Sequence, residues 1–113
     1  IFLYVKNQKL PDSARRQLES LAAKKNQVED NARALTNTEK EINELVRDQD
    51  RLRQNLTALN RVQGQEAQVR KYSTDLAASE SKLAALRDTL ADQRRRDTSL
   101  RAELATLIDQ LSW

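Results

Sequence analysis

The clearest pattern in the sequence is a regular series of apolar residues in its second half. From position 69 to position 111, thirteen positions lie alternately three and four residues apart, and ten of them are apolar. This spacing places the side chains on one narrow stripe of an α-helix, and a stripe with a seven-residue repeat packs against a partner helix as a coiled coil. We call this series the second seam. Its members are Val69, Tyr72, Leu76, Ser79, Leu83, Leu86, Leu90, Gln93, Asp97, Leu100, Leu104, Leu107 and Leu111.

The first half of the chain has a column of mainly apolar residues at every seventh position, which we call the first seam. Its members are Ala14, Leu21, Val28, Leu35, Ile42, Gln49 and Leu56. A flanking column lies four residues after these members early on and three residues after them later. It consists of Leu18, Lys25 and Ala32, and then of Leu45, Leu52 and Leu59. Such a change of side is typical of a stammer, which overwinds a coiled coil locally. We expect one continuous helix, which is least stable over residues 31–39, where Asn and Thr are frequent.

Two local signals mark where the helices begin and end. Pro11 disfavours helix at the residue before it, and Asp12 or Ser13 can cap the free amides of a first helical turn. Gly64, the only glycine, lies where the apolar repeat stops. Glycine readily adopts the left-handed backbone conformation that ends many helices.

These signals predict a helix over residues 13–60, a turn over residues 61–65 and a helix over residues 66–112. A short turn between two long helices makes them antiparallel neighbours. The expected fold is therefore all-α, a single domain formed by a long antiparallel two-helix coiled-coil hairpin, with a short β-strand in residues 1–6.

The two ends of the chain are the most hydrophobic part of the sequence. Residues 1–5 read Ile-Phe-Leu-Tyr-Val, and a lone strand of this kind needs other strands, from a larger sheet or from another copy. The apolar residues of the two ends, called the base patch, are Phe2, Tyr4, Leu10, Ile108, Leu111 and Trp113. Exposed together, they exceed the apolar patch of an ordinary soluble monomer. We expect self-association, most simply as a homodimer. The alternative is a monomer in which the strand and Trp113 fold back on the helix ends.

Composition supports long helices rather than a globular core. Of the 113 residues, 33% are charged and 38% hydrophobic, with one glycine and one proline. The formal net charge is only +3 because 20 basic and 17 acidic side chains are mixed along the chain. The densest basic run, residues 94–96, is flanked by Asp92 and Asp97, at the spacing of helix-surface ion pairs with Arg96 and Arg101. We therefore expect a solvated face and no nucleic-acid partner.

The residues needed for catalysis or metal binding are largely missing. The sequence has no His and no Cys, which removes the commonest general base, nucleophile and transition-metal ligands. One glycine cannot make a glycine-rich phosphate loop. Asp88 and Asp92 share a helix face, but exposed carboxylates of this kind are usually solvated. We expect no enzymatic activity, no catalytic residues, no cofactor and no metal site. No apolar run approaches the roughly 20 residues needed to span a bilayer.

Polar residues interrupt both seams, and two interpretations of them remain open. They are Lys25, Glu39, Gln49, Ser79, Gln93 and Asp97. Buried polar residues can fix the register and partner number of a coiled coil at a cost in stability. Alternatively, their long side chains reach water at the edge of the seam. A hairpin that turns near Val62 brings Lys25 close to Asp97 or Leu100.

One stretch of the first helix resembles a known family. Residues 47–56 read Arg-Asp-Gln-Asp-Arg-Leu-Arg-Gln-Asn-Leu and are followed by Ala58 and Leu59, while Tyr72 and Glu80 lie early in the second helix. This pattern resembles that of mucoidy-inhibitor-like bacterial proteins of unknown function. The resemblance implies a coiled-coil hairpin that projects between β-rich domains, with no catalytic residues and no assigned activity.

Two functional classes follow from the sequence. The first is a structural or interaction arm, a spacer or oligomerisation element of a larger bacterial protein, of which a chain beginning at Ile1 without methionine is expected to be a fragment. The second is the hairpin of a periplasmic adaptor, whose tip docks a channel in an efflux or secretion assembly. The Arg, Leu and Ser tip pattern of such adaptors is not found over residues 61–73.

Overall fold

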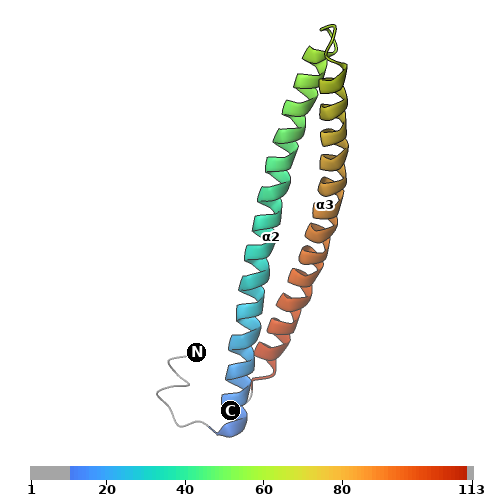
Figure 1. Cartoon of the computed structure of the whole chain (residues 1–113). Helices are drawn as coiled ribbons and strands as arrows, with labels where there is room; N and C mark the ends of the chain where they lie inside the picture. The colour runs from blue at the N-terminus through green and yellow to red at the C-terminus, as the bar shows by residue number, and fades with distance from the viewer. Residues whose placement is uncertain (1–10, 112–113) are drawn as a thin grey trace. The chain divides into compact units, whose positions relative to one another are not determined.

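The structure, a computed structural model, describes residues 11–111 and consists there of two α-helices joined by a turn (Figure 1). Helix α2 spans Asp12–Leu59 and helix α3 spans Glu66–Asp109. The predicted all-α helical hairpin is confirmed. Helix α2 begins and ends one residue earlier than expected, and α3 ends at Asp109 instead of residue 112. The strand predicted for residues 1–6 lies outside the described residues, as do Phe2, Tyr4, Leu10 and Trp113 of the base patch.

The start of α2 follows the local signal in the sequence. The Pro11 carbonyl accepts a hydrogen bond from the backbone amide of Arg15 at 3.0 Å, which closes the first turn. Asp12 lies in that turn, where a carboxylate is stabilised by the partial positive charge of the helix N-terminus. Proline is tolerated here because the first amides of a helix have no partner within it.

The turn between the helices is tight and depends on Gly64. The Val62 amide donates to the Leu59 carbonyl at 3.0 Å, which tightens the last turn of α2. Gly64 has a φ of 83°, the left-handed conformation that side chains with a Cβ rarely adopt. The Val69 amide then donates to the Gln65 carbonyl at 3.0 Å and begins α3. The only glycine thus lies where the chain reverses.

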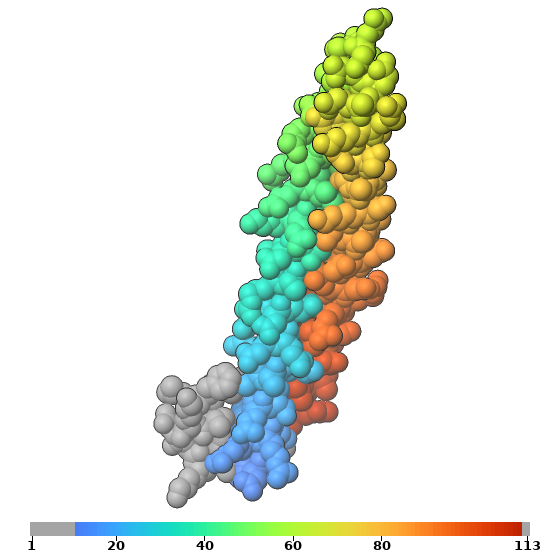
Figure 2. Space-filling model, viewed as in Figure 1, coloured from blue at the N-terminus to red at the C-terminus, as the bar shows by residue number. Residues whose placement is uncertain are grey.

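The chain divides into two compact units, which we describe separately. The terminal unit comprises Ile1–Leu35 and Asp92–Trp113, and the turn unit comprises Thr36–Ala91. In each unit a segment of α2 packs antiparallel to a segment of α3. Figure 2 shows that side chains of the two helices meet directly within the turn unit.

Burial along α3 follows the second seam. All thirteen positions are buried or half-buried, and between Val69 and Leu111 the other such residue is Ala91. Of the large apolar residues in the described part of the chain, Val62 and Ile108 are exposed.

Burial along α2 differs from the expected flanking column. Lys25 is exposed, and its neighbour Lys24 is half-buried instead. From Val28 onward a series of buried or half-buried positions runs at intervals of three and four through Asn31 and Thr38, which are only 8% and 6% exposed, while Ala32 and Glu39 beside it are half-buried as well. The flanking column lies four residues after the first seam at Leu18 but three residues after it at Lys24 and Asn31. It therefore changes side earlier than the apolar residues alone predicted, because the members at these positions are polar.

Candidate interaction surfaces

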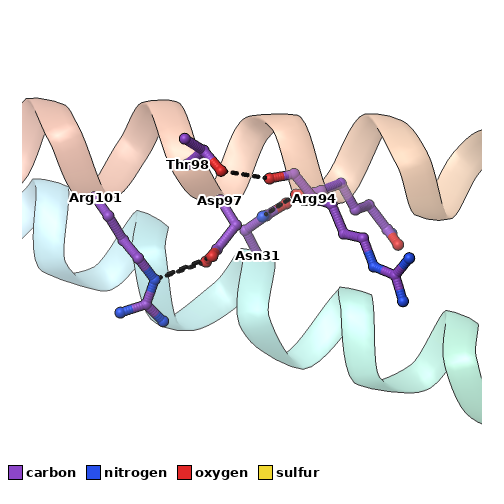
Figure 3. Close-up of polar contacts among 6 residues, drawn as sticks. Asn31, Arg94, Asp97, Thr98 and Arg101 are labelled. Carbon is purple, nitrogen blue, oxygen red and sulfur yellow. Dashed lines mark hydrogen bonds and ion pairs between the residues drawn. The ribbon is translucent and has the colours of Figure 1, made fainter.

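The terminal unit has a mostly apolar core, in which Asn31 makes a polar contact across the helices and Gln93 Oε1 is buried without a hydrogen-bond partner. Its buried apolar residues in the described part are Ala14, Leu18, Leu21, Ala22, Val28 and Leu100. The Asn31 side-chain amide donates to the backbone carbonyl of Gln93 at 2.9 Å. Figure 3 shows this contact beside Asp97, Thr98 and Arg101. The buried amide group of Asn31 therefore has a partner, and the contact ties α2 to one place on α3.

A second contact across the terminal unit involves charge. The Lys24 ammonium lies 2.8 Å from Glu103 Oε2, with the lysine side chain only 23% exposed. At the end of the same unit, Gln17 Nε2 donates to the Gln110 carbonyl at 3.4 Å. Lys24 thus takes the place that the sequence pattern had assigned to Lys25, and its partner is Glu103 rather than Asp97.

Within the basic run of residues 94–96, Arg95 forms an ion pair with a carboxylate of the same helix, and so does Arg101 just beyond the run. Asp97 accepts from Arg101 Nε at 3.0 Å, as the four-residue spacing predicted. Asp92 pairs with Arg95 rather than with Arg96. Contacts of this kind leave the arginines on a solvated helix face, where each pair contributes little to stability.

The core of the turn unit contains polar groups without partners. Gln49 is only 3% exposed, and its Nε2 has no hydrogen-bond partner in the structure. Ser79 Oγ on the facing helix is also buried and without one. Leaving a buried polar group unsatisfied costs about 1–3 kcal/mol. Gln49 therefore lies in the core and not at its edge, whereas Ser79 is half-buried with its hydroxyl oxygen inside, and both unsatisfied groups weaken the core.

Most apolar seam residues of the turn unit are only partly covered. The half-buried ones are Ile42, Leu45, Leu52, Leu56, Leu59, Val69, Tyr72, Leu76 and Leu86, whereas Leu83 and Leu90 are buried. Of the other seam residues named from the sequence, Leu35 and Leu104 in the terminal unit are also half-buried. Two helices alone leave one side of each such residue open to solvent.

The described part of the base patch is open. Ile108 is 51% exposed, and Leu111 is half-buried. Nearby, a hollow of the same unit is lined by Lys24, Ala102, Glu103, Thr106 and Leu107. This end of α3 therefore presents apolar surface beside the Lys24–Glu103 ion pair.

The tip of the turn unit has a second exposed apolar group. Val62 is 53% exposed. It borders a hollow that is also lined by Leu59, Asn60, Gln65, Glu66, Val69 and Arg70. The tip thus combines one exposed aliphatic side chain with polar and charged neighbours.

Further features of the described residues bear on chemistry. Over residues 11–111, no group of three or more Asp or Glu side chains is arranged to hold a metal ion. Neither α2 nor α3 contains a segment long and apolar enough to cross a lipid bilayer. Comparisons with protein-family models, curated proteins and solved structures find no match for this chain.

Proposed function

We propose that this chain is a non-enzymatic structural arm, a coiled-coil spacer or oligomerisation element of a larger bacterial protein, which associates through the base patch. The observation that carries the proposal is the exposure of Ile108 at the end of a helix whose other large apolar residues point into the seam. A half-exposed isoleucine beside Leu111 and Leu107 gains from burial against a second copy. The sequence resemblance to mucoidy-inhibitor-like proteins supports the same role, since it implies a hairpin between other domains.

Sedimentation of the chain with Ile108→Ser tests this function. The variant is expected to shift a homodimer toward monomer at micromolar concentration, because it removes apolar area from the association surface. Removal of residues 1–6 is expected to have the same effect. Val62→Ser is the matched control, because Val62 is exposed to nearly the same extent and lies in the other unit. Monomeric behaviour of the unmodified chain contradicts association through the base.

A second candidate function rests on the tip. Exposed Val62 and the hollow beside it suit docking of a partner by the turn, as in the hairpin of a periplasmic adaptor that binds a channel. For such an adaptor, Val62→Ser abolishes function in the cell while Ile108→Ser has little effect. For a spacer that associates through the base patch, Ile108→Ser impairs function in the cell while Val62→Ser has little effect. The same pair of variants therefore separates the two functions.

A further inference from the structure

A small hollow opens on one side of the turn unit. It is lined by Glu41, Glu44, Leu45 and Asp48 of α2 and by Lys82 and Leu86 of α3, and its volume is about 130 Å³. All six residues belong to the same compact unit.

The apolar part of this hollow consists of two seam leucines. Leu45 and Leu86 are both half-buried, although their positions in the repeat would bury them fully in a larger helical assembly. A cavity of about 150 Å³ accommodates a guest of the size of benzene. The hollow therefore has room for one aliphatic side chain, which would cover both leucines.

The charged part of the hollow is acidic. Three residues with carboxylates, Glu41, Glu44 and Asp48, line the hollow together with one lysine, Lys82. Asp48 is paired with Arg51 at 3.6 Å, whereas Glu41 and Glu44 are exposed and form no ion pair with the described residues. An aliphatic side chain flanked by positive charges would therefore make apolar contacts with the leucines and favourable electrostatic interactions with the carboxylates.

The spacing of the carboxylates favours an extended row of cations over one ion. Glu41, Glu44 and Asp48 are three and four residues apart, so at about 1.5 Å per residue they extend over about 10 Å of one side of α2. Within residues 11–111 no cluster of three or more acidic side chains is arranged to hold a metal ion. A second helix lying along α2, with basic residues at the same intervals, matches this row.

We propose that this hollow binds a basic amphipathic helix of a partner protein. One aliphatic side chain of that helix packs against Leu45 and Leu86, and Lys or Arg residues at intervals of three and four face Glu41 and Glu44. This mode is the insertion of a helix into a groove, with charge on the rim. The proposal rests on the function of the chain as an interaction arm and specifies the class of partner.

Titration of the isotope-labelled chain with a designed peptide tests the proposal. The probe is an alanine-rich helical peptide with three arginines spaced three and four residues apart and one leucine directly after the second arginine. Shifts of backbone amide resonances are expected in residues 41–48 and 82–86. The double variant Glu41→Gln, Glu44→Gln is expected to weaken binding about three- to tenfold, since each exposed ion pair contributes a factor of up to about five. Raising the salt concentration weakens binding as well.

Two controls make the result specific. The double variant Glu19→Gln, Glu29→Gln removes two exposed carboxylates from the terminal unit and is expected to leave affinity unchanged. A peptide of the same composition, with its arginines distributed around the helix, is expected to bind more weakly. Absence of binding, equal binding of both peptides, or equal weakening by both double variants overturns the proposal.

The experiment also distinguishes a second copy of the chain as occupant. If the amides of residues 41–48 shift with protein concentration alone, the hollow binds another copy and the proposal fails. Sedimentation of the Ile108→Ser variant is independent of this hollow. A chain that self-associates through Ile108 but ignores the peptide retains its proposed function and loses only this inference.

Discussion

The terminal and turn units have the same antiparallel pair of helices but different cores. In the described part of the terminal unit, six apolar residues are buried, and the buried amide of Asn31 has a partner on the facing helix. In the turn unit only Leu83 and Leu90 are buried among the apolar residues, beside Thr38 and Gln49. The same apolar repeat therefore gives unequal burial in the two units.

Because their cores differ, the two units are expected to differ in stability. The terminal unit gains stability from apolar burial and fixes its register through Asn31 and Gln93. The turn unit gains less from burial and carries the unpartnered Gln49 Nε2 and Ser79 Oγ, whereas the described part of the terminal unit carries one such atom, Gln93 Oε1. We therefore expect the terminal unit to be intrinsically the more stable one, and the turn unit to depend more on additional packing, such as a helix in the hollow beside Leu45.

The largest effect is expected from truncating a leucine of the terminal core. Leu100→Ala should lower the free energy of unfolding by about 2–4 kcal/mol, because Leu100 is only 5% exposed. Leu86→Ala in the turn unit should cost less, because Leu86 is half-buried and water already reaches part of it. Chemical denaturation measures both. Asp88→Ala, an exposed neighbour of Leu86, is the control and should change stability by less than about 0.5 kcal/mol. Equal costs for the two leucines would contradict the difference between the units.

The next largest effect is a gain of stability in the turn unit. Gln49→Leu should raise the free energy of unfolding by about 1–2 kcal/mol, because it removes a buried amide nitrogen without a partner and adds apolar contact. Thermal unfolding followed by circular dichroism detects this gain as a higher Tm. Gln54→Leu, an exposed position on the same helix, is the control and should leave Tm nearly unchanged. A lower Tm for Gln49→Leu would mean that the amide has a stabilising role.

A smaller, opposite effect is expected at the polar contact of the terminal unit. Asn31→Ala should lower the free energy of unfolding by about 1 kcal/mol, because it removes the hydrogen bond to the Gln93 carbonyl. Asn26→Ala, at an exposed position of α2, is the matched control. Chemical denaturation of both variants is the measurement. If Asn31→Ala stabilised the chain as Gln49→Leu is expected to do, the two polar seam residues would be equivalent and the comparison would fail.

The sequence predicted the helical hairpin because apolar periodicity and one glycine are strong local signals. Breaks in periodicity coincide with the turn, and Gly64 adopts the left-handed conformation that was expected. Less predictable was the course of the seam through Lys24, Asn31 and Thr38. A search for apolar residues passes over these positions, and only the intervals of three and four, applied regardless of polarity, would have found them.

Candidate surfaces were harder to predict than the fold. Exposure of Ile108 followed from an apolar surplus that a two-helix seam cannot bury. The hollow beside Leu45 and Leu86 did not follow, because its lining comes from residues on two helices, and the extent to which half-buried leucines remain open depends on side-chain packing. Periodicity assigns residues to a face but gives no measure of how well that face is covered.

The smallest predicted effects concern the ion pairs that join the two helices in each unit. Lys24 and Glu103 are 2.8 Å apart, and the lysine side chain is 23% exposed. In the turn unit, Arg53 and Glu80 are 3.6 Å apart, and both side chains are at least half exposed. Exposed pairs contribute about 0.2–1 kcal/mol, and the contribution falls with distance and solvent screening. Double-mutant cycles to Ala should therefore give a coupling energy near the upper value for Lys24–Glu103 and near the lower value for Arg53–Glu80, both decreasing at high salt. A larger coupling for Arg53–Glu80 would mean that the turn unit is held together by its charges more strongly than its core suggests.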